Sequence, residues 1–226
     1  MATPARRVFR PLFHWVVRPL LKRYLKSTRR YRYRGITVTV PAGVFHPRFF
    51  FSTRFLLSYL DGVAVSGRSV LELGAGSGLV ALWLARRGAT VTASDINPAA
   101  VAAVRANAVA NGVALSVQEA DLFDGLAGGP FDGIVINPPY YPGTAGDAGE
   151  RAWYYGEDYA YFRRLFAGAG DHLATGGAMH MVLSEDCGLA PIRELAEAAG
   201  WMVTVAAARH FWGERLEVWV VAPLRL

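Results

Sequence analysis

The chain has 226 residues, of which 53% are hydrophobic, and its formal net charge is +6. This length and apolar content suit a single α/β domain whose sheet is covered on both faces. The single cysteine, Cys187, excludes an internal disulfide and indicates a reducing compartment, so we expect a cytoplasmic protein in which Cys187 is a packing residue. The five histidines are scattered without ligand spacing, so no metal site is predicted.

Charge is distributed unevenly along the chain. Residues 1–60 contain thirteen Lys or Arg and no acid, whereas the remaining residues contain eleven bases and eighteen acids. Five basic or histidine side chains recur every four residues, as in an amphipathic helix: Arg10, His14, Arg18, Lys22 and Lys26. Pro19 is expected to kink or divide this helix, and its apolar stretch is too short and too charged to span a bilayer.

Three interpretations of this basic segment remain open. It can cap the sheet with its charges solvated, contact nucleic acid or the ribosome, or bind a membrane surface. Beyond it, residues 31–34 and 36–40 alternate about Gly35 and predict a hairpin. Residues 49–60 then predict a helix before the first core strand.

A glycine-rich loop follows the first core strand. The apolar run 69–73 leads into Gly74-Ala75-Gly76-Ser77-Gly78, and residues 79–87 predict a helix. Glycines allow a tight turn and let a ligand approach the backbone. A dinucleotide fingerprint would require its third glycine at position 79, where the chain has Leu79.

Two acidic residues follow the next two predicted strands. Strand 90–94 ends in Asp95, whose carboxylate can accept hydrogen bonds from both hydroxyls of a ribose. Alternatively, Asp95 can cap the helix that begins near Pro98. Strand 115–119 is followed by Asp121 and Leu122.

The tetrapeptide Asn137-Pro138-Pro139-Tyr140 ends a fourth apolar strand, residues 133–136. The prolines restrict the backbone around a carbonyl, Asn137 adds an amide oxygen, and Tyr140 adds a ring that can stack. Two acceptors beside an aromatic ring suit a planar NH2 group, such as a carboxamide or a nucleobase amine. The alternative interpretation is a rigid proline-rich turn.

The second half of the chain predicts a substrate side and closing strands. Residues 142–150 are rich in small residues and lead to Trp153-Tyr154-Tyr155, which suggests a mobile substrate lid, with local core packing as the alternative. The remaining predicted elements are helices at 158–173 and 189–199 and strands at 178–183, 201–209 and 217–224, with a turn at Gly213 between the last two.

These motifs, in this order, resemble the class I S-adenosylmethionine-dependent methyltransferases, in particular the NPPY subgroup that methylates amide or amino nitrogens. The subgroup includes glutamine methyltransferases of release factors and adenine-N6 and guanine-N2 enzymes. The resemblance covers roughly residues 43–226, and it implies a Rossmann-like seven-stranded α/β sheet with helices on both faces and an antiparallel final hairpin. We therefore divide the chain into a basic N-terminal arm, residues 1–42, and a methyltransferase catalytic domain, residues 43–226.

The resemblance also implies roles for individual residues around the cofactor S-adenosyl-L-methionine. The methionine part is assigned to the loop residues and to one helical residue: Gly74, Ala75, Gly76, Gly78 and Thr53, with Arg54 as a second candidate on that helix. Asp95 is assigned to the ribose, Asp121 and Leu122 are assigned to the adenine, and Ile96 is a further cofactor-binding residue. Glu72 either orders the glycine loop or contacts the ligand. Asn137 and the Pro138 carbonyl are expected to hold the target nitrogen, in a motif that Pro139 and Tyr140 complete.

The predicted function is therefore N-methylation of a macromolecule, with a protein glutamine side chain ahead of a nucleobase amine in RNA or DNA. Two departures leave the substrate open: the chain lacks the longer N-terminal helical domain of the release-factor enzymes, and Tyr141-Pro142 follows the motif where they have an aliphatic residue. An interpretation from a different class is a non-catalytic nucleic-acid-binding module with a vestigial cofactor fold. The intact acidic and NPPY positions argue against it.

Overall fold

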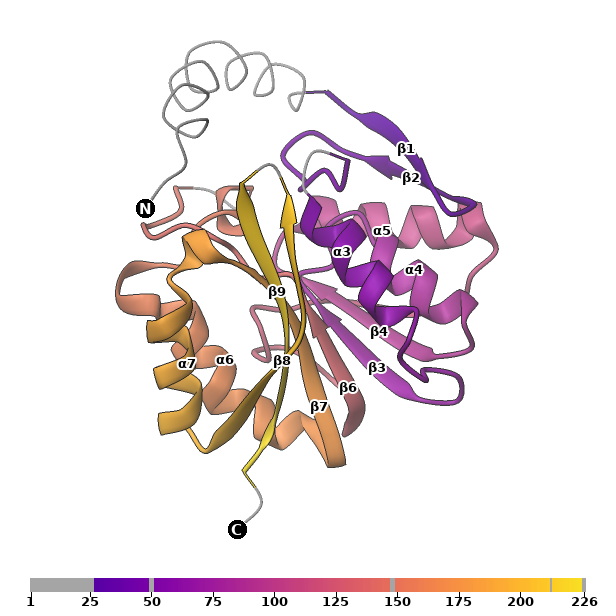
Figure 1. The fold of residues 1–226 in the computed structure, drawn as a ribbon. Coiled ribbons are helices and arrows are strands. Elements are labelled where there is room, and N and C mark those ends of the chain that lie inside the picture. Colours follow the sequence, from indigo (N-terminus) through magenta and orange to yellow (C-terminus); the bar gives the residue numbers. More distant parts are fainter. Residues whose placement is uncertain (1–26, 49–50, 147–148, 212, 225–226) are drawn as a thin grey trace.

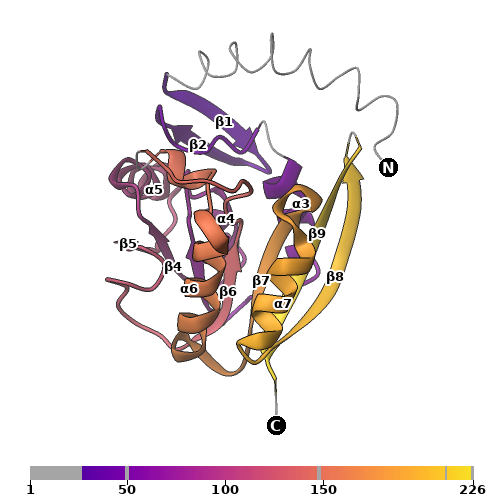
Figure 2. The same cartoon turned by 90° about the vertical axis from the view of Figure 1, so that its left-hand side faces the viewer.

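A seven-stranded sheet runs through the protein, with helices on both of its faces (Figures 1 and 2). The structure is a computed structural model, and it describes residues 27–48, 51–146, 149–211 and 213–224. The strands are β1 (Arg29–Tyr33), β2 (Ile36–Val40), β3 (Ser69–Leu73), β4 (Thr90–Asp95), β5 (Ser116–Glu119), β6 (Phe131–Ile136), β7 (Leu173–Ser184), β8 (Trp201–Phe211) and β9 (Glu214–Pro223). The α-helices are α3 (Phe51–Leu60), α4 (Leu79–Arg86), α5 (Pro98–Asn111), α6 (Ala160–Gly168) and α7 (Leu189–Ala198). Short 3-10 helices are η2 (Glu150–Ala152), η3 (Glu157–Tyr159), η4 (Ala169–His172) and η5 (Glu185–Cys187).

The order of strands in the large sheet is β5-β4-β3-β6-β7-β9-β8. The first five of these pair in parallel, whereas β9 pairs antiparallel with both β7 and β8. The predicted seven-stranded α/β sheet with an antiparallel final hairpin is therefore confirmed. Because β3 lies between β4 and β6, the loops that follow these three strands meet at one edge of the sheet. Among the described residues, no helix combines the length and apolar character needed to cross a membrane.

Alternate residues of the central strands enter two separate cores. Val70 belongs to the core that also contains α3, α4, α5 and β2, whereas Leu71 and Leu73 belong to the core under α6 and α7. Figures 1 and 2 show these two groups of helices on opposite faces of the sheet. Burial on both faces explains why these strands are almost continuously apolar. Cys187 is fully buried in the second core, as expected for a packing residue.

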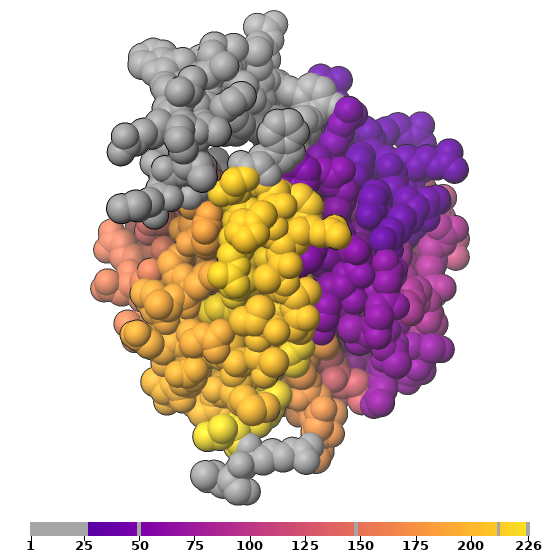
Figure 3. All heavy atoms as spheres, in the orientation of Figure 1, coloured from indigo at the N-terminus to yellow at the C-terminus, as the bar shows by residue number. Residues whose placement is uncertain are grey.

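The predicted hairpin forms from β1 and β2, and it packs against α5. Figure 3 shows it in indigo beside α3. Asn107 of α5, 2% exposed, accepts from the Thr39 N–H at 2.8 Å and donates to the Thr39 carbonyl at 2.9 Å. The same side chain donates to the Ser77 carbonyl at 3.0 Å, so one amide links the hairpin to the glycine loop. The predicted amphipathic helix of residues 10–26 lies outside the described residues, and the division of the chain at residue 42 stays a prediction.

The helix predicted for residues 158–173 is wrong at both ends. Asp158 and Tyr159 have φ values of 48° and 57°, so α6 begins only at Ala160. After Gly168 the chain continues as η4, and Leu173 is already the first residue of β7. β7 is twelve residues long, and it passes through Gly176 and Gly177, which the sequence pattern placed before the strand.

Glu72 of β3 is a buried acid that fixes the start of α4. Its carboxylate accepts from the Ala81 N–H at 2.7 Å, and the residue is 6% exposed. Burial raises the pKa of Glu72 well above its ordinary value, and the neighbouring Asp95 carboxylate raises the pKa further. Glu72 thus orders the first turn of α4, and its predicted roles toward the glycine loop and the ligand stay predictions.

This raised pKa makes stability depend on pH. A carboxyl whose pKa is higher in the folded state binds more protons there than in the unfolded chain. Its contribution to stability is therefore full below its ordinary pKa of 4.5 and is lost as pH rises through the higher folded pKa. Glu72→Gln keeps an oxygen for the Ala81 N–H but cannot ionise, so the free energy of unfolding should fall less steeply with pH above 4.5.

Urea unfolding at a series of pH values measures this difference. The matched control is Glu119→Gln on the exposed edge strand β5, which should keep the parent profile. Identical pH profiles for the parent and Glu72→Gln would contradict the prediction.

Candidate active site

A cavity of about 350 Å³ lies where β3, β4 and β6 end. Thirteen of the fifteen residues that the sequence assigned to the cofactor or the target line it: Thr53, Glu72, Gly74, Ala75, Gly76, Asp95, Ile96, Asp121, Leu122, Asn137, Pro138, Pro139 and Tyr140. They are brought together because parallel strands deliver their following loops to the same edge of the sheet. Gly78 does not line the cavity.

The glycines of the loop have different reasons to be glycine. Gly78 has φ +78°, and a Cβ there would lie 3.0 Å from the Val104 side chain, so its place is set by packing against α5. Gly74 has φ +70°, and a Cβ there would meet no protein atom within 4 Å. Since Gly74 lines the cavity, its missing side chain leaves room for a ligand.

Asp95 supports the glycine loop from the end of β4. Its Oδ2 accepts from the Gly76 N–H at 2.8 Å, and its Oδ1 accepts from the Asn97 N–H at 2.9 Å. Burial raises the pKa of Asp95, whereas these backbone hydrogen bonds lower it. Each oxygen keeps a further acceptor site, because a carboxylate can accept about four hydrogen bonds.

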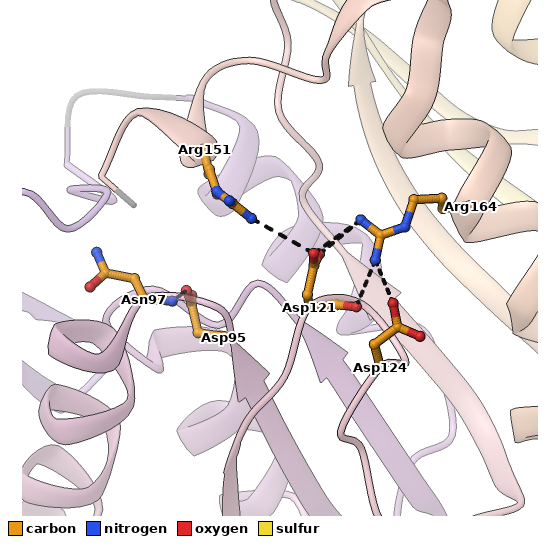
Figure 4. A network of polar contacts seen from close by, with 6 residues as sticks. All are labelled: Asp95, Asn97, Asp121, Asp124, Arg151 and Arg164. Carbon is orange, nitrogen blue, oxygen red and sulfur yellow. Dashed lines mark hydrogen bonds and ion pairs between the residues drawn. The ribbon is translucent and has the colours of Figure 1, made fainter. Parts of the chain in front are cut away.

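The alternative role of Asp95 as the cap of α5 is wrong. The N-cap residue is Asn97, whose side chain accepts from the Ala99 N–H at 3.0 Å, with Pro98 as the first helical residue. Figure 4 shows Asn97 beside Asp95 in the loop before this helix. Asp95 is therefore not needed to begin α5.

Asp121 lies within a network of charges (Figure 4). Arg164 of α6 donates to both carboxylate oxygens of Asp121, at 3.1 and 3.0 Å, and to Asp124 at 2.8 Å. Arg151 of η2 lies 3.7 Å from the Asp121 carboxylate on its other side. The network fixes the direction of the Asp121 side chain at the cavity wall.

Asn137 makes hydrogen bonds at both ends of its carboxamide. The Tyr140 hydroxyl donates to Asn137 Oδ1 at 3.0 Å, and Asn137 Nδ2 donates to Ser52 Oγ at 3.3 Å. Burial raises the pKa of Tyr140 well above its ordinary value, so its hydroxyl stays protonated and remains a donor. The Tyr140 ring packs against both cores, so its hydrogen bond adds a role to the stacking predicted from the sequence.

The two polar candidates on α3 differ in position. Thr53 is 5% exposed and lines the cavity, as a residue near the ligand must. Arg54 does not line it, and its guanidinium instead lies over the Phe51 ring, 5.0 Å from the centroid.

The segment after Tyr140 folds back over the cavity. Tyr141 exchanges backbone hydrogen bonds with Trp153 and Tyr155, at 2.8 and 2.9 Å. Trp153 and Tyr154 line the cavity, and the Trp153 ring lies 5.5 Å from the Phe45 ring. Tyr155 also lines it but is 5% exposed and belongs to the second core. The positions of Trp153 and Tyr154 are therefore compatible with a lid, whereas Tyr155 is a packing residue. Motion of the lid stays a prediction.

Three residues at the site have no sequence signal of their own: Ser52, Arg151 and Arg164. Each is a common residue type outside any motif, and each reaches its partner across 30 to 85 residues of chain. Ser52 directly precedes Thr53 on α3, and both line the cavity. This adjacency to a predicted site residue is the one feature of the sequence that could have pointed to Ser52.

Comparison with known proteins agrees with this geometry. The methyltransferase small domain family matches residues 35–212. The ribosomal RNA small subunit methyltransferase C of Chromohalobacter salexigens is 35% identical over 185 residues, which are 80% of this chain and 51% of that protein. The release factor glutamine methyltransferase of Deinococcus radiodurans is 38% identical over 148 residues, 60% of this chain and 52% of that protein. The chain therefore spans about half the length of these curated relatives.

Among solved structures, a T. thermophilus 16S rRNA N2-guanine methyltransferase in complex with AdoMet and guanosine has a TM-score of 0.65 and 26% identity. The match covers 88% of this chain and 50% of that one. The parallel sheet, the glycine loop and the cavity at the strand ends are thus those of a known class of fold, and the chain belongs to the methyltransferase small domain family.

Proposed function

We propose that the protein is an S-adenosylmethionine-dependent N-methyltransferase that acts on a planar amide or amino nitrogen. The observation that carries the proposal is the Asn137 carboxamide, held at both ends in a cavity whose other wall contains Asp95 and Asp121. One wall thus offers hydrogen-bond acceptors to a target N–H, and the other offers acceptors to the hydroxyls and amine of a nucleoside.

The residues present fit this cofactor. Each carboxylate oxygen of Asp95 accepts one backbone hydrogen bond, from Gly76 or from Asn97. Each oxygen can still accept a hydrogen bond from a ribose hydroxyl. Asp121 and the backbone of Leu122 lie on the cavity wall as partners for an adenine. The space beside Gly74 suits the methionine part, with Gly76, Ala75 and Thr53 close by.

The bound cofactor supplies a methyl group on a positively charged sulfur. The protein's task is to present a nitrogen lone pair to that methyl. Asn137 Oδ1 has two lone pairs, of which Tyr140 takes one, so the second can accept one target hydrogen while the Pro138 carbonyl accepts the other. These contacts strengthen as positive charge develops on the nitrogen, and the methylated nitrogen is then acidic enough to lose its proton to water.

The substrate that we place first is a nucleobase amine in RNA. The similarity to the ribosomal RNA methyltransferase extends over 80% of the chain, further than the similarity to the glutamine methyltransferase at 60%. The described part of the basic arm also presents the exposed residues Arg30 and Arg32 on β1. This reverses the order predicted from the sequence, which put protein glutamine first. Glutamine remains the second candidate because two release-factor relatives are 43% identical over 97 residues and 38% identical over 148 residues.

The remaining assignments follow from that substrate. The basic arm, residues 1–42, is the segment proposed to contact RNA or the ribosome, and residues 43–226 form the proposed catalytic domain. A substrate of the translation apparatus and a buried free cysteine both support a cytoplasmic location.

Cofactor affinity should depend on Asp95. Asp95→Ala removes an acceptor for the ribose hydroxyls and should weaken binding of S-adenosylmethionine roughly tenfold or more, since a hydrogen bond to a charged group contributes about 1.5–3 kcal/mol. Calorimetric titration measures this change, with the exposed Asp171→Ala as the matched control. Because Asn97 caps α5, the variant should keep its helix content. Parent-like affinity in folded Asp95→Ala would exclude Asp95 from the cofactor site.

Chemistry should depend on Asn137. With methyl-labelled cofactor and ribosomal subunits, the parent protein should produce label that nuclease releases and protease does not. Asn137→Ala loses a contact that strengthens in the transition state, worth about 2.7–4 kcal/mol, so single-turnover transfer should slow roughly a hundred- to thousandfold.

The control for Asn137→Ala is its affinity for the cofactor, which should match that of the parent. Transfer by Asn137→Ala within a few-fold of the parent rate would overturn the proposed chemistry. Label that protease releases would leave the chemistry intact and replace RNA by protein glutamine as the substrate.

A further inference from the structure

Ser52 contacts the proposed reaction centre from a different element of the fold. It lies in the first turn of α3, is 2% exposed and lines the same cavity as Asn137. Its hydroxyl oxygen accepts from Asn137 Nδ2 at 3.3 Å across 85 residues of sequence. Neither the NPPY motif nor the cofactor motifs require this residue.

The contact between Ser52 and Asn137 affects whether the oxygen or the NH2 group of the Asn137 carboxamide faces the target nitrogen. The terminal torsion of an asparagine side chain is broad and roughly two-fold, so packing alone distinguishes its two orientations poorly. In one orientation the amide oxygen can accept a target N–H. In the other, the NH2 group faces the target, and two donors oppose each other.

The hydrogen bonds of Asn137 in the structure correspond to the first orientation. The hydroxyl of the half-buried Tyr140 donates to Asn137 Oδ1 at 3.0 Å, lies 3.5 Å from the Val182 carbonyl and also interacts with the Ser52 hydroxyl. The NH2 end then faces Ser52, whose hydroxyl has lone pairs to receive it. The carboxamide is thus held by one hydroxyl at each end.

We propose that Ser52 is a positioning residue for the methyl transfer, because it holds the Asn137 carboxamide with its oxygen available to the target nitrogen. This inference rests on the proposed function. Ser52 contacts neither the target nor the transferred methyl in this role, and it acts through Asn137. Its effect should therefore be on turnover more than on binding of cofactor or substrate.

The expected effect is moderate. The 3.3 Å distance is at the long end of the hydrogen-bond range, and a single neutral hydrogen bond changes an equilibrium by about threefold to tenfold. Ser52→Ala should lower the single-turnover rate by about that factor, with KM and cofactor affinity within about twofold of the parent. Ser52→Thr restores a hydroxyl and should recover most of the rate.

The matched control is Ser58→Ala, an exposed serine of the same helix, which should keep the parent rate. Ser52→Cys covers the case in which Ser52→Ala is unstable, because it preserves volume but offers a weaker acceptor. A double variant gives the sharper test. If Ser52 acts only through Asn137, Ser52→Ala should have no further effect in an Asn137→Ala background, where independent effects would multiply.

A second measurement does not need any activity. The side-chain NH2 resonance of Asn137, identified by its loss in Asn137→Ala, should exchange faster with water in Ser52→Ala than in the parent or in Ser58→Ala. If the parent transfers no methyl group while this resonance responds as described, the proposed function fails and the positioning contact stands.

Three outcomes would overturn the proposal: a parent-like rate in folded Ser52→Ala and Ser52→Cys, an equal loss in Ser58→Ala, or an Asn137 resonance unchanged by removal of Ser52. A multiplicative effect in the double variant would show that Ser52 acts by a route other than Asn137, and it would overturn the proposal too.

Discussion

The glycine loop between β3 and α4 and the first turn of α4 need partners for their backbone N–H groups, and the buried Glu72 and the half-buried Asp95 supply them. Glu72 accepts from Ala81 at the start of α4, and Asp95 accepts from Gly76 within the loop. Both acids lose solvation on folding, and burial accordingly raises the pKa of each. The loss of solvation is offset because backbone N–H groups left without an acceptor in the protein interior would also raise the free energy of the folded state. The cavity, its acidic wall and the approach to Gly74 all depend on a loop held in this way.

The wall that follows β4 and β5 and the wall formed by the NPPY segment carry different kinds of hydrogen-bond acceptor. The first must keep carboxylates available beside a ligand, and around Asp121 this is achieved by Arg164 and Arg151, which offset its charge. The second carries no charged group in the motif itself, and it relies on neutral acceptors whose direction is fixed by Tyr140 and Ser52. Neutral acceptors suit a reaction in which positive charge appears on nitrogen, because they stabilise that charge without taking the proton beforehand.

The parts of the site that sequence predicts are those that lie at the ends of strands. Asp95, Asp121 and Asn137 each follow an apolar strand, and parallel pairing alone brings them together. Ser52, Arg151 and Arg164 come from helical segments, where only the packed fold decides which side chain reaches the cavity. The same limit explains the error at residues 158–173, because Asp158 and Tyr159 adopt a left-handed conformation that is uncommon outside glycine and has no signal in the sequence.

Selection between the two candidate substrates cannot reside in the NPPY segment. A glutamine carboxamide and a guanine amine both present a planar NH2 group, so acceptors on Asn137 and Pro138 treat them alike. What differs is the area of the flat surface and the charge attached to it, and both are met at the rim of the cavity. There the Phe45 and Trp153 rings lie 5.5 Å apart and Tyr141 is 44% exposed. The hairpin adds the exposed Arg30 and Arg32, which do not line the cavity. Aromatic rings and exposed cations favour a stacked base with its phosphates over a flexible aliphatic side chain, and this supports the proposal of RNA as the substrate.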